Sequence, residues 1–195
     1  MAITYVYRES ENQKTQLVAL TQKDKDGNQV LSGSDFPVIT VDTNHHRLHE
    51  GRAFLAEHLI NNGSTLADQA TIDFVFACPL GIYPHVTLSG SCGGDAELFF
   101  FEGTVSTGGT LYTPIRRNRS IVASSNVAMV LNPTISSAGT TLISDLIVGG
   151  GKTKTGGGEG AGLEFVMNPL TNYMARLKNV SGAPQVAHLA VEWYE

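Results

Sequence analysis

The chain has 195 residues, of which 42% are hydrophobic and 16% charged, and its formal net charge is −5. This length predicts one domain with a sizeable core, and the acidic balance argues against general nucleic-acid binding, which needs a basic surface. The sequence contains no apolar run of about 18 residues, so we expect no membrane-spanning helix, and its start, MAITYVYRES, lacks the apolar core of a secretory signal.

Residues 1–35 differ in texture from the rest of the chain. Polar and charged stretches at 8–16 and 22–29 surround short apolar runs such as LVAL at 17–20. A segment of this kind buries little apolar surface by itself. We therefore expect an extended N-terminal arm. Either a strand or two in it are ordered in part by partner contacts, or the arm is flexible and has no role.

Residues 36–195 show regular alternating or apolar runs separated by turn-forming stretches such as NNGS and VSGAP. The pattern predicts an all-β domain, an antiparallel β-sandwich or jelly-roll-like fold. The stretch 52–60 is predicted as a strand, with a helix as the alternative. The runs predicted as strands are 36–41, 52–60, 70–78, 83–90, 96–103, 120–132, 140–150, 163–169, 172–180 and 186–195.

Two of these runs predict which side chains are buried. Strict alternation along a strand places every second residue on the same face. The faces expected to be buried carry Tyr173, Ala175 and Leu177 in one run and Ala187, Leu189, Val191 and Trp193 in the other. The opposite faces are expected to be wet, as in a sheet with one solvated side. Cys78 and Cys92 are expected to be partly buried free thiols, with a hairpin disulfide as the alternative.

The stretch VDTNHHRLHEGRAF at 41–54 is the first candidate for chemistry, because it holds His45, His46 and His49. A zinc-protease helix needs the spacing HExxH, but Ala53 stands where the second histidine is required. No helix is signalled here. On a strand, His45, Arg47 and His49 would share one face. These three histidines are weak metal-ligand candidates; the alternative is a polar strand entry or a subunit contact.

A glycine-rich stretch at 149–162 resembles a phosphate-binding loop only superficially. That motif would require a glycine at position 146, where Leu146 stands, and the glycines that follow Lys152 and Thr153 cannot begin a stable helix. We expect a long flexible loop between two strands. No nucleophile arrangement or acid–base carboxylate pair is recognisable, so we predict a protein without enzymatic activity or cofactor.

Arginines form the densest basic cluster, in PIRRNRS at 114–120. Guanidinium groups suit the recognition of carboxylates. In an acidic protein the cluster is either a contact for an acidic partner or a solvated turn. The candidate partner-binding residues are Arg47, Arg52, Arg116, Arg117 and Arg119.

Residues 40–54, with the pattern HxxHEGRxF, and residues 163–195, with NYxxRxxN and WYE, are similar to a group of small virion proteins of tailed bacteriophages. The similarity covers about residues 36–195. It implies a virion structural protein, made in the host bacterial cytoplasm. We expect a capsid decoration protein on the capsid surface, bound to the major capsid protein as a homo-oligomer, with a trimer favoured, and without nucleic-acid or membrane partners.

Two alternatives belong to other classes. A tail- or baseplate-associated structural or host-glycan-binding protein would have an exposed groove with aromatic and paired polar groups. A metal-dependent jelly-roll enzyme would bring together imidazoles from His45, His46, His49 or His85 around an ion.

Overall fold

The protein is described by a computed structural model that covers residues 3–10, 13–23, 29–31, 47–61, 63–122, 124–149, 156–159 and 163–195. The chain divides into two compact units, residues 1–42 and 43–195. The predicted boundary between residues 35 and 36 lies outside the described residues, as does the run predicted as a strand at 36–41.

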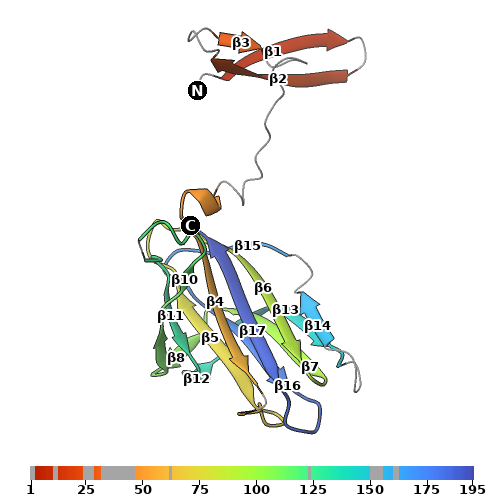
Figure 1. The fold of residues 1–195 in the computed structure, drawn as a ribbon, viewed down its shortest axis with the longest axis vertical. Coiled ribbons are helices and arrows are strands. Elements are labelled where there is room, and N and C mark those ends of the chain that lie inside the picture. The colour runs from red at the N-terminus through yellow and green to blue at the C-terminus, as the bar shows by residue number, and fades with distance from the viewer. Residues whose placement is uncertain are drawn as a thin grey trace. The chain divides into compact units, whose positions relative to one another are not determined.

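The N-terminal unit contains a three-stranded sheet in the order β1-β2-β3 (Figure 1). Strand β1 pairs antiparallel with β2 along its whole length, from Ile3 opposite Leu20 to Ser10 opposite Gln13, and β3 pairs with the end of β2. These strands are β1 (Ile3–Ser10), β2 (Gln13–Lys23) and β3 (Gln29–Leu31).

The second unit is an antiparallel β-sandwich, which confirms the predicted fold class. Its strands are β4 (Ala53–Ile60), β5 (Thr71–Ala77), β6 (His85–Cys92), β7 (Ala96–Glu102), β8 (Val105–Thr107), β9 (Thr110–Tyr112), β10 (Ile115–Arg116), β11 (Ala128–Leu131), β12 (Thr134–Ser137), β13 (Thr140–Ile147), β14 (Gly156–Glu159), β15 (Phe165–Val166), β16 (Asn172–Asn179) and β17 (Ala187–Tyr194). None of the helices among the described residues has the length and hydrophobicity of a membrane span.

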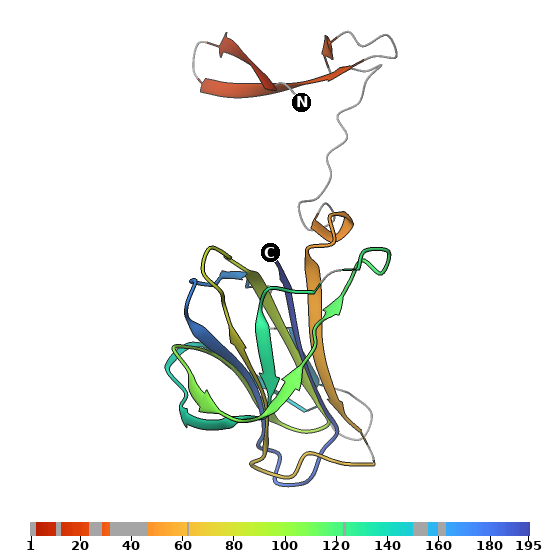
Figure 2. The same ribbon diagram turned by 90° about the vertical axis from the view of Figure 1, so that its left-hand side faces the viewer.

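Two six-stranded sheets form the sandwich (Figures 1 and 2). The β17 sheet has the order β10-β4-β17-β6-β14, with β15 also paired to β6, and the β16 sheet has the order β13-β7-β16-β5-β11-β9. Strands β4 to β7 alternate between the two sheets, and β16 and β17 do so again. A separate two-stranded ribbon pairs β8 with β12.

Alternating side chains explain why these runs form strands with one buried face. In β6 every second residue is buried, from Val86 to Cys92. The predicted inward faces of β16 and β17 are confirmed, because all seven residues assigned to them are buried, with at most 3% of their surface exposed. The run 52–60 is a strand, so the helical alternative for it is wrong.

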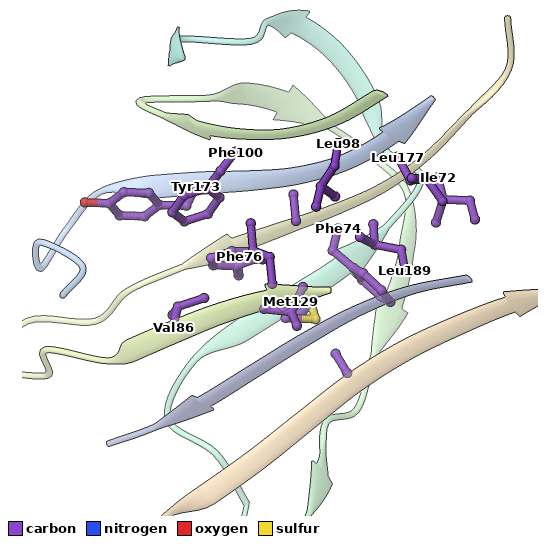
Figure 3. Packing of buried hydrophobic residues seen from close by; sticks show 14 of the residues in the cluster. Ile72, Phe74, Phe76, Val86, Leu98, Phe100, Met129, Tyr173, Leu177 and Leu189 are labelled. Carbon is purple, nitrogen blue, oxygen red and sulfur yellow. The ribbon is translucent and has the colours of Figure 1, made fainter. Parts of the chain in front are cut away.

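The core lies between the inner faces of the two sheets. It includes a group of aromatic rings in which Phe76, Phe100 and Tyr173 stack with centroids 5.7 to 6.3 Å apart (Figure 3). Gly90 stands opposite this core in β6, where an added Cβ would lie 3.2 Å from a methyl carbon of Leu177. The two sheets therefore approach too closely at Gly90 for a larger residue to fit without movement.

A second, smaller apolar cluster corrects one sequence prediction. Met174 was assigned to the wet face of β16, yet it is fully buried and packs with Val75 and Phe101 on the outer face of the β16 sheet. Ile135 in β12 and the adjacent Ala138 pack against the same cluster. The outer face is thus covered locally by the β8–β12 ribbon, and pattern alone does not reveal that cover.

Two predicted strands are much shorter in the structure. Among the described residues of the run 120–132 only Ala128–Leu131 form a strand, and in the run 163–169 only Phe165–Val166 do. The first shortening matters for function, because the described residues between β10 and β11 form a loop instead of a ladder.

Replacing Tyr173 by phenylalanine is expected to lower the free energy of unfolding by about 1 to 2 kcal/mol. The Tyr173 hydroxyl donates to Glu102 Oε1 at 2.7 Å and accepts from the Asn168 N–H at 2.9 Å, and Phe cannot replace either bond. Urea denaturation measures the change. Tyr83→Phe is the matched control, since Tyr83 is 59% exposed; equal effects of both substitutions would contradict the prediction.

The same hydroxyl predicts a loss of stability at alkaline pH. Burial, and then the hydrogen bond to Glu102, raise the pKa of Tyr173 from 10.0 to about 12. The folded state therefore holds this proton more tightly than the unfolded state, so its contribution is complete below about pH 10 and is lost as the pH rises to about 12. Between about pH 10 and about pH 12, the free energy of unfolding should fall more for the wild-type protein than for Tyr173→Phe.

Candidate functional site

The histidine-rich stretch is partly described and is not extended there. Residues 47–49 form a helical turn, so the expectation that Arg47 and His49 lie on one face of a strand is wrong. Arg47 Nη1 lies 3.4 Å from Glu50 Oε2, and Arg52 Nε lies 3.8 Å from the same oxygen. These local ion pairs explain why charged residues cluster there.

Metal binding by this stretch stays a prediction. His45 and His46 lie outside the described residues, and His49 is exposed. Within the described part of the chain, no group of three or more His, Cys, Asp or Glu side chains is placed to hold a metal ion.

The structure separates the arginines of the 114–120 cluster. In β10, Arg116 stands opposite Phe54 of β4, and the Arg117 N–H donates to the Ala53 carbonyl. Residues directly opposite in an antiparallel pair share a face, and neighbours along a strand alternate. Arg116 therefore shares the inner face of Phe54, whereas Arg117 reaches the outer face and pairs with Glu192 at 2.7 Å.

Arg116 has an unusual environment. Its guanidinium carbon lies 5.1 Å from the centre of the Phe54 ring, a cation–π contact. Its Nε is buried and has no hydrogen-bond partner. Gly51, at a φ of 72°, leaves room for it, since a Cβ there would lie 2.8 Å from Arg116 Nη1. No carboxylate among the described residues forms an ion pair with this guanidinium.

A hollow of about 490 Å³ lies beside Arg116; we call it the arginine groove. Its lining is Leu111 and Tyr112 of β9, Thr113, Pro114, Arg116, Arg119, Ile121, Val122, Ser124, Ser125 and residues 127–129 at the start of β11. It contains two arginines, Arg116 and Arg119, and no Asp or Glu. Ligand sites commonly have volumes of about 300 to 1,000 Å³, so the groove is large enough to hold several side chains.

Hydrogen bonds at both sides hold the groove open. The Tyr112 hydroxyl accepts from the Glu57 N–H at 3.1 Å and donates to the Glu57 carbonyl at 2.8 Å, which ties β9 to β4. Across the groove, the Glu195 carboxylate accepts from the Ser125 hydroxyl and from the Asn126 side-chain amide, at 2.6 Å for the amide. The groove is thus bounded on both sides by hydrogen bonds within the fold.

A second hollow, of about 560 Å³, shares Arg116 with the arginine groove. Glu50, Arg52 and Glu195 also line it, so its charges are mixed. Of the five arginines predicted to bind a partner, the structure brings Arg116 and Arg119 together in one groove and Arg52 and Arg116 in the other. Arg47 and Arg117 line neither of these hollows.

The sequence did not predict a polar cluster on the outer face of the β17 sheet. Tyr194 at the end of β17 stands opposite His85 at the start of β6, and their rings stack with centroids 4.6 Å apart. The Tyr194 hydroxyl donates to Glu164 Oε1 at 2.5 Å and lies 3.0 Å from His85 Nδ1, which also hydrogen-bonds to Glu164. We call His85, Glu164 and Tyr194 the histidine cluster.

Charge and hydrogen bonding give this cluster its chemistry. The hydrogen bond from Tyr194 is the largest cause that lowers the pKa of Glu164 below 4.5, and the hydrogen bond and charge of His85 act in the same direction. A shallow hollow of about 90 Å³ next to it is also lined by Arg117 and Glu192. The three members are 30 to 109 positions apart in sequence. The register of β6 with β17 joins His85 to Tyr194, and the pairing of β15 with β6 brings Glu164 beside them. The only feature of the sequence that pointed to this cluster was the alternation of β17, which puts Glu192 and Tyr194 on one polar face.

The remaining sequence candidates are structural where they are described. Cys78 and Cys92 are both free and buried, and burial, with the charge of Glu195, raises the pKa of Cys78 to about 12. This agrees with the predicted free thiols and not with the disulfide. In the glycine-rich stretch, Gly156–Glu159 forms β14 and pairs with β6, so this part is not a loop; residues 150–155 and 160–162 lie outside the described residues.

Comparisons with protein-family models, with curated proteins and with solved structures found no match to this chain. The resemblance to virion proteins of tailed bacteriophages therefore stays a prediction.

Replacing Tyr194 by phenylalanine is expected to raise the pKa of Glu164 toward its ordinary value of 4.5, because the substitution removes the strongest hydrogen bond to the carboxylate. Carboxyl ¹³C chemical shifts followed through a pH titration measure this pKa. Tyr83→Phe is the control, since Tyr83 is not among the groups that shift this pKa. An unchanged Glu164 titration in Tyr194→Phe would show that the hydrogen bond is not formed in solution.

Proposed function

We propose that the protein is a non-catalytic structural component of a bacteriophage virion. In this proposal it is a decoration protein that binds the major capsid protein on the capsid surface as a homo-oligomer, with a trimer favoured, and it stabilises the capsid. The resemblance of residues 36–195 to virion proteins supports the class. The observation that carries the proposal is the make-up of the N-terminal unit.

The N-terminal unit is too small to be stable through its own core. It spans residues 1–42, and its described strands form one three-stranded sheet whose third strand has three residues. Units of about 40 residues or fewer usually need disulfides, a metal or association with another chain. Residues 1–42 contain neither Cys nor His, which removes disulfides and the usual zinc ligands. In this proposal, association with a partner supplies the missing stability.

An N-terminal unit that is stabilised by association with another chain suits a protein whose role is to attach to a capsid. A decoration protein has to bind a lattice of identical subunits, and a strand-rich arm can do so by adding strands to a neighbouring sheet. The described core residues of the sandwich run from Phe54 to Trp193. In this proposal the two units have separate tasks, attachment for the first and a stable body for the second.

A chain that starts at residue 43 is expected to keep the folded sandwich but to lose association. Light scattering after size exclusion should give a trimer for the full chain, and the shortened chain should dissociate at concentrations at which the full chain does not. Cosedimentation with heads and, separately, with tails of the virion tests the location. Binding to heads that depends on residues 1–42 is the expected result.

Circular dichroism and thermal unfolding serve as the control for folding of the shortened chain. A full chain that is monomeric and binds neither heads nor tails would overturn the proposal. Binding to tails alone would favour the tail- or baseplate-associated alternative. Unfolding of the shortened chain would show that residues 1–42 belong to the sandwich.

The histidine cluster favours one second candidate, the host-glycan-binding tail protein. Its hollow combines the stacked rings of His85 and Tyr194 with the carboxylates of Glu164 and Glu192, which can accept hydrogen bonds from sugar hydroxyls. Saturation-transfer NMR of the full chain with a panel of monosaccharides and disaccharides tests it. Binding that is lost in Glu192→Gln and kept in Glu97→Gln, on the other sheet, would support this function; absence of any transfer would exclude it for these sugars.

A further inference from the structure

We propose that the arginine groove binds a peptide segment of a partner protein that carries a carboxylate next to apolar side chains. Arg116 and Arg119 would bind the carboxylate, and the apolar wall of the groove would take the neighbouring side chains. This inference does not depend on the proposed virion role or on the N-terminal unit, because the groove lies wholly within the sandwich.

Charge is the first argument. The protein has a net charge of −5, yet the groove is lined by two arginines and no carboxylate. Among the described residues neither arginine forms an ion pair, and Arg116 also has a buried Nε without an acceptor. A partly buried cation without a counter-charge is costly for a fold. A carboxylate from outside the chain would supply the missing counter-charge, and arginine favours carboxylates through paired hydrogen bonds.

Arg117 shows that the missing counter-charge is specific to the arginine groove and is not shared by every arginine of the 114–120 cluster. It adjoins Arg116 in sequence but pairs at 2.7 Å with Glu192 on the outer face of the β17 sheet. The chain therefore pairs a carboxylate with the arginine that points away from the groove, whereas no described carboxylate lies within ion-pair distance of the two that line it.

The apolar wall is the second argument. Leu111 is 78% exposed, and Val122 is fully exposed, while Ile121 is 37% exposed. All three line the groove beside the arginines. Apolar side chains gathered around a cationic centre match a ligand that is acidic and apolar together, such as alternating Glu and Leu residues. They do not match a nucleic-acid backbone, which offers charge without apolar groups.

The test uses the full chain and two capped hexapeptides, acetyl-ELDIEL-amide and its neutral counterpart acetyl-QLNIQL-amide. Two-dimensional ¹⁵N NMR detects the backbone amides around the groove and the arginine Nε–H groups during titration. We expect shifts at Arg116, Arg119 and residues 121–125 with the acidic peptide only. Added salt should weaken the binding, because screening reduces the attraction between charges.

Variants decide which residues are responsible. Arg119→Gln changes an exposed residue and should fold normally. Arg119→Gln and Arg116→Gln are each expected to weaken peptide binding about tenfold, because each substitution removes a charge-assisted hydrogen bond. Arg117→Gln is the matched control and should bind as the wild type. The proposal is overturned if no groove signal shifts at millimolar acidic peptide, if the neutral peptide binds equally, or if Arg119→Gln binds as tightly as Arg117→Gln.

Discussion

The structure depends on the burial of two alternating sheet faces against each other around a set of stacked aromatic rings. Phe76, Phe100 and Tyr173 fill the space between the sheets, and Tyr173 is the only one of the three that carries a polar atom. Its hydroxyl reaches Glu102 and the Asn168 amide at the rim of the core, so the ring can be buried without an unsatisfied donor. Within the sandwich, the two grooves and the histidine cluster lie at the edges or on the outside of this packed layer.

The edges of the sheets explain where the grooves are. The chain leaves the β16 sheet at β9 and enters the β17 sheet at β10 within a few residues, so this crossing closes one side of the sandwich. Strand β10 is only two residues long, and the chain beyond it forms a loop before β11. The Tyr112 hydroxyl takes the place of a strand partner for Glu57. A hollow remains where a longer strand would have covered the core.

The sequence predicted what depends on local alternation and missed what depends on distant segments. The inward faces of β16 and β17 follow from period-two patterns, and these predictions are confirmed. Met174 could not be placed correctly, because its burial results from a ribbon formed by β8 and β12 far away in the chain. The run 120–132 was apolar enough to be predicted as a strand, although most of it has no partner strand and packs as a loop.

The candidate sites divide in the same way. The arginine cluster was visible in the sequence because several arginines stand close together. Alternation along the strand sends Arg116 and Arg117 to different faces, so composition alone gave the same role to residues that have different environments. The histidine cluster was invisible, since no local pattern joins His85, Glu164 and Tyr194. In both cases the decisive information is strand register, which places Arg116 over Phe54 and His85 beside Tyr194. An arginine paired within the chain is accounted for by the fold, whereas the two unpaired ones that face a groove are the basis of the proposed peptide site.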